Sequence, residues 1–285
     1  MESIKLKAKA KINLSLDVIR KREDGYHDLK MIMQNVDLYD EIFLEKIKEG
    51  ITVNTDSDIV PNGKGNIAYK AAFEMKKKYG FEGGLKIYIK KKIPVEAGLA
   101  GGSSDAASII KGINKIFMMN LNENELLKVG KSIGADVPFC IKGGTQFSEG
   151  IGDKLTEIEL LDDVNIIIIK PSLSISTSWA YKNLNLNDIE NKPNSNSLLE
   201  AVNRKDVKYI AQNMKNVFES LVEKKYNLIS KVKEDLVKFG ALGSLMSGSG
   251  SSVFGIFEDV KVAKMAETKL FESGYKIVIR TKTCK

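Results

Sequence analysis

The stretch Pro94-Val-Glu-Ala-Gly-Leu-Ala-Gly-Gly-Ser-Ser-Asp-Ala-Ala107 predicts a glycine-rich loop that opens a helix. Its glycines permit backbone angles that a side chain would forbid, and Ser103 to Asp105 follow as capping and first-turn residues. Apolar residues then recur near helical spacing from Ala106 to Phe117. A helix N-terminus presents N–H groups and partial positive charge, so the stretch has the form of a phosphate cradle.

This loop is not diagnostic when taken alone. Neither Gly-x-x-x-x-Gly-Lys-Ser/Thr nor Gly-x-Gly-x-x-Gly occurs in the chain. A flexible connection between a strand and a helix explains the same glycines. The remaining chain has to decide between these two interpretations.

Composition indicates a soluble globular protein with room for one large domain or two ordinary ones. The chain has 285 residues, of which 43% are hydrophobic and 28% are charged. The apolar run at Ile166 to Ile169 is too short to span a bilayer, and the N-terminus alternates lysine with apolar residues, unlike a secretory signal. We expect a cytoplasmic protein without a membrane partner.

Charge and cysteine content exclude several classes of site. The net charge is +7, but lysines are spread along the whole chain, which favours a solvated surface over a nucleic-acid face. The two cysteines, Cys140 and Cys284, give neither a disulfide framework nor a zinc spacing.

The N-terminal segment alternates strictly between apolar and polar residues from Ile4 to Val18. Period-two alternation predicts extended structure with one buried face, so Lys11 and Asn13 project from the same face. Lys11 and Asn13 can serve a functional site on this face, or they can simply be the solvent side of an edge strand.

A polar turn at Asp24-Gly25 leads to Tyr26 and to His27, the only histidine of the chain, and a second strand follows to Phe43. A single histidine excludes two-histidine metal sites. His27 can belong to a functional site, or it can be an ordinary surface residue beside a turn.

Further elements follow in order. We expect a helix over Ala68–Lys78, a strand over Leu85–Lys92, and a helix with a capping box at Asn122 and Glu125 that Gly134 ends. After Gly134 the chain restarts at Asp136, whose simplest role is the N-cap of a following helix.

The pattern after residue 160 differs from the first part and suggests a domain boundary there. Val164 to Thr281 reads as strand, helices, strand, helix and strand, with two helical stretches divided near Tyr226. Asn183–Ser197 reads as an exposed loop, and Ser247-Gly-Ser-Gly-Ser-Ser252 is a second glycine-serine loop.

Three segments in this order, Lys11-Ile-Asn13, Pro94–Ala107 and Ser247–Ser252, resemble the signature motifs of the GHMP kinases. Four more stretches, Ala10–Leu14, Asp24–His27, Gly134–Pro138 and Glu149–Asp153, resemble the members that phosphorylate a cytidyl diphosphate substrate in non-mevalonate isoprenoid synthesis. The resemblance covers essentially the whole chain.

The resemblance implies an α+β, two-domain GHMP kinase fold. Residues 1–160 would form the N-terminal domain, of the ribosomal protein S5 domain 2-like type, with the ATP-binding glycine loop. Residues 161–285 would form a C-terminal ferredoxin-like α/β sandwich.

The resemblance also implies catalytic and ATP-binding residues. Asp136 would be the general base for the substrate hydroxyl and Lys11 the nearby cation, unless the lysine is the more important group and the carboxylate orients it. Asn66 and Lys91 fall where the family contacts adenine. The residues expected around ATP are Asn66, Lys91, Pro94, Gly98, Leu99, Ala100, Gly101, Gly102, Ser103, Ser104, Gly248 and Ser249.

The same resemblance implies a cytidyl site. Tyr26 and His27 would contact the cytosine and Tyr181 would stack on its ring, because aromatic side chains hold bases by their faces. Asn13 and Thr177 would position the rest of the substrate.

Two departures from the family pattern concern the loop. Ala100 stands where related sequences often have glycine, and Asp105 where some have asparagine. A carboxylate near phosphates requires a balancing cation or an orientation away from them, which leaves the role of Asp105 open. We expect Mg²⁺ with ATP, with no protein ligand assigned.

Two rival functions remain at this level. A homoserine or mevalonate kinase is disfavoured because Tyr26-His27 has no purpose with a small aliphatic substrate. An RNA-binding module is suggested by a pI near 9.1, but no aromatic RNA-binding motif or KH-type Gly-x-x-Gly context supports it. We expect a small-molecule substrate, no nucleic-acid partner, and a monomer or homodimer.

Overall fold

The computed structural model describes residues 2–189 and 191–285, which gather into two compact units. Unit 1 contains the chain up to Ala10, Leu38–Val95 and Ala100–Gly143, and unit 2 contains Lys11–Asp37, Glu96–Leu99 and Gly144–Lys285. Two long strands, β1 (Ser3–Lys21) and β2 (His27–Ile47), contribute one part to each unit. This grouping follows spatial contact, and the sequence boundary near residue 160 stays a prediction.

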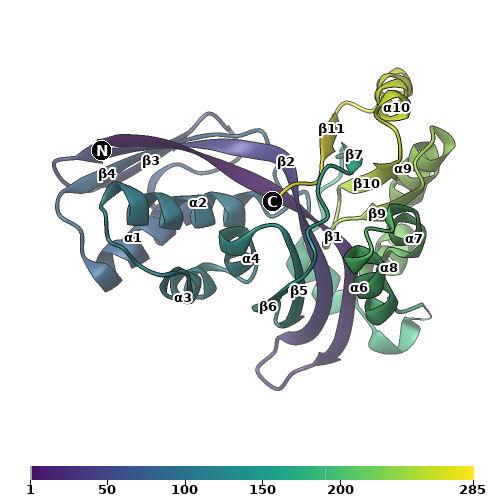
Figure 1. The fold of residues 1–285 in the computed structure, drawn as a ribbon, viewed down its shortest axis with the longest axis horizontal. Helices are drawn as coiled ribbons and strands as arrows, with labels where there is room; N and C mark the ends of the chain where they lie inside the picture. The colour runs from purple at the N-terminus through teal and green to yellow at the C-terminus, as the bar shows by residue number, and fades with distance from the viewer. Residues whose placement is uncertain (1, 190) are drawn as a thin grey trace. The chain divides into compact units, whose positions relative to one another are not determined.

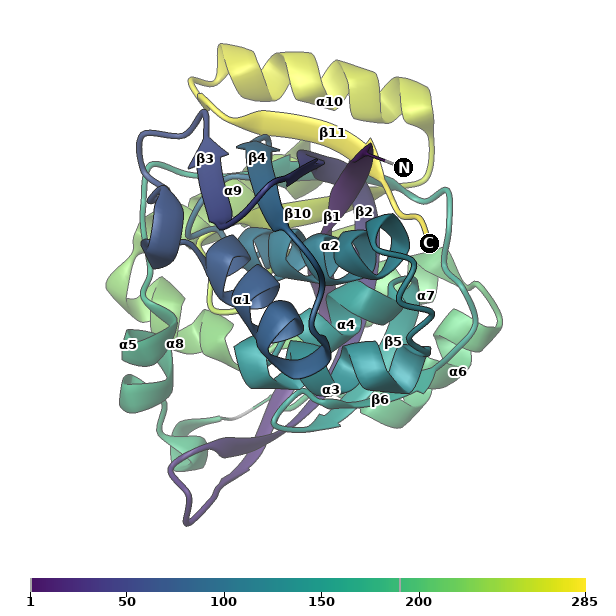
Figure 2. The same ribbon diagram turned by 90° about the vertical axis from the view of Figure 1, so that its left-hand side faces the viewer.

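Unit 1 is a two-layer arrangement of sheet and helices. Its strands lie in the order β3-β4-β2-β1, with β3 (Ile51–Thr55) parallel to β4 (Gly84–Lys90) and β4 antiparallel to β2. One face is covered by helices (Figures 1 and 2), which are α1 (Ile67–Tyr79), α2 (Gly101–Ile116), α3 (Glu123–Ile133) and α4 (Val137–Lys142). A short 3-10 turn, η1 (Gly63–Gly65), precedes α1.

Helix α2 is the central helix of this layer. Ile109, Ile110 and Ile113 are fully buried, as the helical spacing predicts. Gly112 lets the helix approach the sheet closely, because a Cβ there would come within 2.3 Å of Leu44 Cδ1 on β2. The C-terminal half of α2 therefore packs closely against β2 in unit 1.

The expected helix boundaries of unit 1 are confirmed in two cases and wrong in one. Asn66 caps α1 by accepting from the Ala68 N–H, and Asn122 and Glu125 form a reciprocal capping box on α3. In contrast, none of Ser103 to Asp105 caps α2. The helix begins at Gly101, and its N-cap position is Ala100, with φ 56° and no capping side chain.

Unit 2 contains the other parts of β1 and β2 and a second sheet. β5 (Thr145–Gly150) pairs with β2 and with β6 (Lys154–Glu157), and β8 (Lys215–Asn216) runs parallel to β1. The second sheet is antiparallel, in the order β11 (Val278–Lys282), β7 (Asn165–Ile169), β10 (Val253–Phe257) and β9 (Gly243–Met246).

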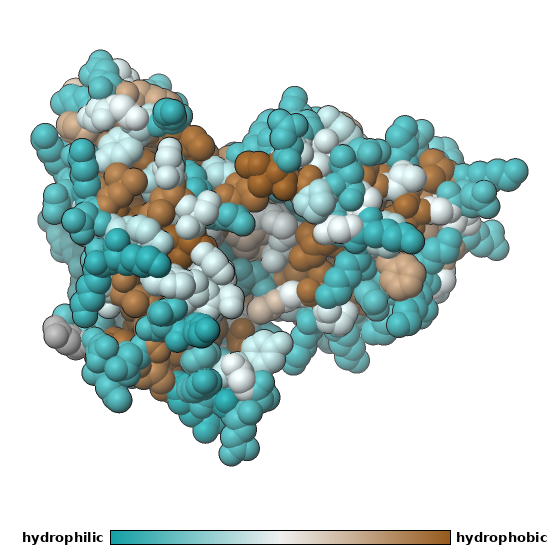
Figure 3. Space-filling model, turned by 180° about the vertical axis from the view of Figure 1, so that it is seen from behind, coloured by the Kyte–Doolittle hydropathy of each residue, from teal (hydrophilic) through white to brown (hydrophobic). Residues whose placement is uncertain are grey.

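Helices α9 (Asn227–Lys238) and α10 (Val260–Glu272) pack on this second sheet. The remaining elements of unit 2 are α5 (Thr177–Asn183), η2 (Leu186–Asp188), α6 (Ser195–Asn203), α7 (Val207–Asn213) and α8 (Phe218–Lys225). Hydrophilic side chains occupy most of the surface seen in Figure 3, with smaller apolar groups among them.

Most strands expected from the sequence are present. The structure differs from the expectation in the helical region and in the loop before it. The division of the helical region near Tyr226 is confirmed, but the chain also breaks at β8, where Lys215 and Asn216 pair with Ser15 and Leu16 of β1. The loop expected at Asn183–Ser197 contains η2 and the start of α6, and residue 190 lies outside the described residues.

Candidate active site

The polar face of β1 in unit 2 is buried. Lys11 is 4% exposed and Asn13 is fully buried, so the alternative of a solvent-facing edge strand is wrong. The Lys11 ammonium donates to Asn13 Oδ1 at 2.6 Å, and Asn13 Nδ2 contacts Met31 Sδ at 3.6 Å. The amide therefore orients the ammonium, as period-two spacing on one strand face allows.

The middle of the first glycine stretch and the second glycine-serine loop touch within unit 2. Gly98 has φ +73°, and a Cβ on it would lie 2.0 Å from the Ser247 carbonyl oxygen. Ser247 Oγ donates to the Gly98 carbonyl at 2.9 Å, and the Ser252 N–H donates to the Ala97 carbonyl at 3.2 Å. No side chain fits at position 98, which explains the glycine.

Lys11 lies beside both of these segments. Its backbone N–H donates to the Leu99 carbonyl at 3.1 Å, and a Cβ built on Gly248 would lie 3.4 Å from Lys11 Nζ. Three segments distant in sequence, around residues 11, 98 and 248, are thus brought together within unit 2. Their backbones place an ammonium at the junction of two glycine loops.

Asn216 holds the second loop by hydrogen bonds. The sequence patterns did not indicate this residue. Its Nδ2 donates to the Met246 and Gly248 carbonyls at 2.8 and 2.7 Å, while its Oδ1 accepts from the Phe218 N–H at 3.0 Å. Its side chain is 5% exposed. A lone asparagine between two helices gives no sequence signal, because its partners lie 30 and 32 residues further on.

Two of the expected substrate residues, His27 and Tyr181, form an aromatic group with Phe218 in unit 2. The rings of His27 and Tyr181 have centroids 5.1 Å apart at 36°, and Tyr181 meets Phe218 edge-on at 4.8 Å. Burial and the nearby Lys21 lower the pKa of His27, which favours the neutral imidazole. Tyr26 is 60% exposed.

Thr177, at the start of α5, contacts the second loop. Its hydroxyl lies 2.8 Å from Ser249 Oγ, within hydrogen-bonding distance. Ser176 caps the helix, so the Thr177 hydroxyl is not used as the N-cap. The family-based substrate role of Thr177 and the ATP role of Ser249 thus fall on two touching side chains.

In unit 1, three ionisable side chains meet where β4 ends and α2 begins. The Lys91 ammonium contacts Asp40 Oδ2 and lies 2.7 Å from Asp105 Oδ2. Asp40 Oδ1 also accepts the backbone N–H groups of Lys92 and Ile93, at 2.5 and 2.8 Å. We call Asp40, Lys91 and Asp105 the charge cluster.

The charge cluster is buried, and burial sets its protonation. The side chains of Asp40, Asp105 and Lys91 are 0%, 3% and 9% exposed. Desolvation raises the pKa of Asp105 to about 8 against the attraction of Lys91, and the nearby Asp40 raises it further. Desolvation opposes a charged Lys91, but Asp105 and Asp40 together outweigh it and raise the pKa of this ammonium.

The other expected residues of unit 1 lie near the first turn of α2. A Cβ on Gly102 would meet Ile67 next to Asn66, and a Cβ on Gly134 would lie 4.0 Å from Ser103 Oγ. Ser104 Oγ donates to the Lys9 carbonyl. Asp136 occupies the N-cap position of α4, yet its side chain makes no capping hydrogen bond.

Some expected pairings remain predictions. Asp136 belongs to unit 1 and Lys11 to unit 2. The joint catalytic role expected for these two residues therefore stays a prediction. The amide of Asn66 is used in the α1 cap and in a bond to the Pro61 carbonyl at 2.8 Å. The adenine roles of Asn66 and Lys91 stay predictions.

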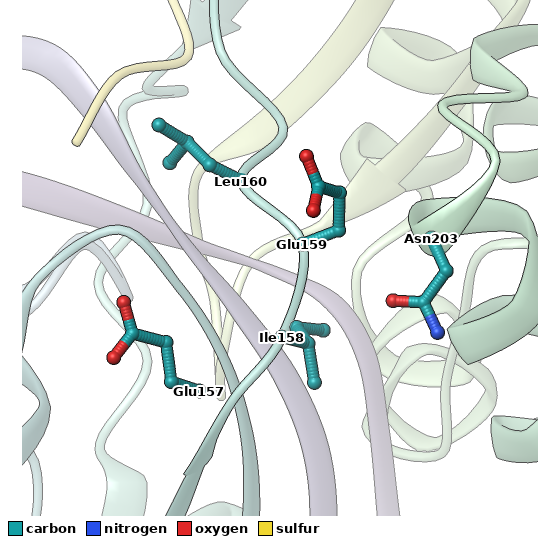
Figure 4. A pocket seen from close by; sticks show the side chains of 5 residues that line it. All are labelled: Glu157, Ile158, Glu159, Leu160 and Asn203. Carbon is teal, nitrogen blue, oxygen red and sulfur yellow. The ribbon is translucent and has the colours of Figure 1, made fainter.

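A hollow of about 530 Å³ in unit 2 is a poor candidate for the site (Figure 4). It is lined by Glu157, Ile158, Glu159, Leu160 and Asn203, none of which the sequence indicated. Two carboxylates repel a polyphosphate, and Glu159 already pairs with Lys205 at 3.2 Å.

No described helix has the length and apolar content needed to cross a bilayer. Within residues 2–189 and 191–285, no group of three or more His, Cys, Asp or Glu side chains is arranged to hold a metal ion.

The fold and the three converging motifs define a class of small-molecule kinase. Residues 66–144 match the GHMP kinases N terminal domain, and residues 198–276 match the GHMP kinases C terminal domain. The chain belongs to the GHMP kinase family, with its two-domain fold of mixed α and β structure.

Similar proteins narrow the class. The chain is 54% identical over 279 residues to the 4-diphosphocytidyl-2-C-methyl-D-erythritol kinase of Acetivibrio thermocellus, covering 98% of this chain and 99% of the relative. The enzyme of the same name from Clostridium botulinum is 46% identical over 274 residues, covering 96% and 98%.

Solved structures agree. A crystal structure of 4-(cytidine 5'-diphospho)-2C-methyl-D-erythritol kinase matches with a TM-score of 0.86 and 29% identity, over 99% of this chain and 100% of that one. The homoserine kinase of Cytophaga hutchinsonii matches with a TM-score of 0.77 at 19% identity, over 100% and 95%, and shares the fold.

Proposed function

We propose that this chain transfers the terminal phosphoryl group of ATP to the 2-hydroxyl of 4-diphosphocytidyl-2-C-methyl-D-erythritol, a step of non-mevalonate isoprenoid precursor synthesis. The observation that carries the proposal is the 54% identity, over nearly the full length of both chains, to a kinase of that name. The aromatic group of His27 and Tyr181 supports it, since a cytosine needs ring faces to stack on.

The chemistry requires positioning, charge compensation and removal of one proton. The acceptor oxygen forms a bond to the γ-phosphorus while the bond to the bridging oxygen of ADP breaks, and the hydroxyl proton goes to a base. We assign the base to Asp136 and the compensating cation to Lys11, whose ammonium is oriented by Asn13. Lys11 lies beside Gly248, which suits a cation that accompanies phosphates.

The glycine loops supply N–H groups for the phosphates. Helix α2 is long and begins directly after Ala100, so its N-terminus carries the partial positive charge that attracts an anion. Magnesium would enter with the nucleotide and neutralise phosphate charge, which matches a site in which ATP oxygens and water fill most positions around the ion.

His27, Tyr181 and Thr177 serve the acceptor. The neutral imidazole of His27 offers one donor and one acceptor to a base edge, while Tyr181 presents a ring. Phe218 fixes the Tyr181 ring edge-on. We place the protein in the cytoplasm, where ATP is available and where thiols such as Cys140 and Cys284 are kept reduced.

A coupled ADP-release assay tests the proposal. Purified protein is given ATP and Mg²⁺ with the cytidyl substrate, with homoserine, with mevalonate, or with no acceptor. We expect acceptor-dependent ADP release with the cytidyl substrate and product mass increased by one phosphoryl group. Turnover on mevalonate or homoserine, with none on the cytidyl compound, would overturn the proposal.

A further inference from the structure

The family resemblance places Lys91 at the adenine base, but the ammonium and the backbone N–H of Lys91 are already engaged in unit 1. Its ammonium contacts Asp40 and Asp105, and its backbone N–H donates to Asp56 Oδ1 at 2.8 Å. An ammonium that moved to a base would leave two buried carboxyl groups without their cation. That loss is costly, because breaking a buried ion pair strands a charge away from water.

The contacts of the charge cluster join the two flanks of the first glycine stretch. Asp40, on β2, accepts the N–H groups of Lys92 and Ile93 just before Pro94, while Asp105 lies in α2, five residues after Ala100. Lys91 connects the two carboxyl groups. A Cβ on Gly101 would lie 3.5 Å from Lys91 Nζ, so the ammonium also lies against the start of the helix.

We propose, resting on the proposed kinase function, that Asp40, Lys91 and Asp105 are positioning residues that hold the start of α2 for the ATP phosphates, and that Lys91 acts through the loop rather than on adenine. The flanks of a loop tied at both ends lose less conformational entropy when they order around a ligand. Nucleotide affinity then depends on the charge cluster without any dependence on the base.

The burial of Asp105 governs the charge state of the cluster. Asp105 Oδ1 is buried and has no hydrogen-bond partner among the described residues. Two carboxylates share one ammonium, and the charged groups that act on Asp105 within the described residues are Lys91, after β4, and Asp40, on β2. A proton on Asp105 makes the cluster neutral, which keeps negative charge away from the N-terminus of α2.

Nucleotide selectivity separates the two roles of Lys91. Binding of fluorescent ATP and GTP analogues is measured without acceptor for the wild type and for Lys91→Met, with Lys92→Met as the matched control. Lys92 is the neighbouring lysine, and its ammonium pairs with Glu41 at the surface, at 2.6 Å and 43% exposure. Because no acceptor is present, the result does not depend on which acceptor the enzyme uses.

We expect Lys91→Met to weaken both nucleotides by the same factor, about tenfold, and Lys92→Met to weaken neither. An ATP-to-GTP preference that collapses in Lys91→Met would place the ammonium on adenine and overturn the inference. Unchanged affinity for both nucleotides would overturn it as well.

Asp105→Asn keeps the inference testable if Lys91→Met folds poorly, since asparagine has the size of a neutral aspartic acid. Between pH 7 and 9 the wild type should lose ATP affinity as Asp105 ionises, whereas Asp105→Asn should lose less. The double variant Lys91→Met/Asp105→Asn should bind ATP better than Lys91→Met alone, because one stranded carboxyl group is gone. Additive losses and identical pH profiles would contradict a shared cluster.

Discussion

The two glycine-serine segments of this kinase are held by different forces. The flanks of the first, around Lys91 and Asp105, are tied by three buried ionisable groups in unit 1. The second, Ser247–Ser252, is tied by neutral groups in unit 2, chiefly the amide of Asn216. Charged ties change with protonation, whereas amide and hydroxyl ties do not, so the tie made by Asn216 is itself independent of pH. One ionisable group does act next to the second loop, because the Met246 N–H donates to Glu219 Oε1 at 2.7 Å and desolvation raises the pKa of Glu219.

The largest expected effect comes from a residue outside both sets of ties. Asp136→Ala should lower kcat by about 10²-fold or more, because a general base contributes on that scale, while ATP affinity stays within about twofold. Single-turnover kinetics and nucleotide binding measure the two quantities. Asp136→Asn, which keeps the size of the side chain, is the control, and unchanged kcat in both variants would remove Asp136 from the mechanism.

The next largest effect is expected from a substitution that breaks the contact between the two glycine segments in unit 2. Gly98→Ala should lower the free energy of unfolding by more than the ~1–2 kcal/mol of a left-handed backbone, since its Cβ also meets the Ser247 carbonyl at 2.0 Å. Gly274→Ala is the matched control, with φ +93° and nothing within 4 Å. Urea unfolding compares them, and equal losses would mean that the close approach carries no cost.

Removing the neutral tie should cost somewhat less. Asn216→Ala leaves two buried carbonyls and the Phe218 N–H without this partner, and we expect a loss of about 2 kcal/mol that is the same at pH 6 and pH 9. Asn213→Ala removes one exposed hydrogen bond, to the Tyr209 carbonyl at 2.9 Å, and should cost much less. A loss that varies with pH would show that the second loop is not held independently of charge.

The smallest effect, counted per pH unit, is the pH dependence of the charged tie. The folded-state pKa of Asp105, about 8, lies above its value of 3.8 in an unfolded chain. Its stabilising contribution is therefore complete below pH 3.8 and is lost as pH rises through about 8. Between pH 6 and pH 9 the wild type should lose stability by at most about 1.4 kcal/mol per pH unit from this group.

Asp105→Asn is the comparison for this pH dependence. It lacks the titrating group, so its melting temperature should fall less over the same pH range. Parallel curves for the two proteins would show that Asp105 is already ionised at pH 6, and the contrast between the loops would then need another basis.

Residue patterns were sufficient for the strand at Ile4–Val18, the helix after Asn66, the cap at Asn122, and the motifs around Lys11, Gly98 and Ser247. Each is a short-range pattern in which a few neighbouring residues favour one backbone conformation. The capping role of Ser103 to Asp105 failed for a physical reason: Ser104 and Asp105 bind Lys9 and Lys91 instead, and the helix begins earlier at Gly101.

Asn216, Asp40 and the partner of Asp105 could not be found in this way. Asn216 reaches carbonyls 30 and 32 residues away, and Lys91 reaches a carboxyl group 51 residues earlier. A hydrogen bond or ion pair over such separations depends on how strands and helices pack, for which a single sequence carries no local pattern.

The amino-acid sequence determined the family, the order of the strands and helices around the glycine segments, and the residue types available for phosphoryl transfer, because these follow from local conformation and from motif spacing. Packing decided which charges meet and which carboxyl group holds a proton. Those properties depend on burial and on distances of a few ångströms, and both arise only when the chain has folded.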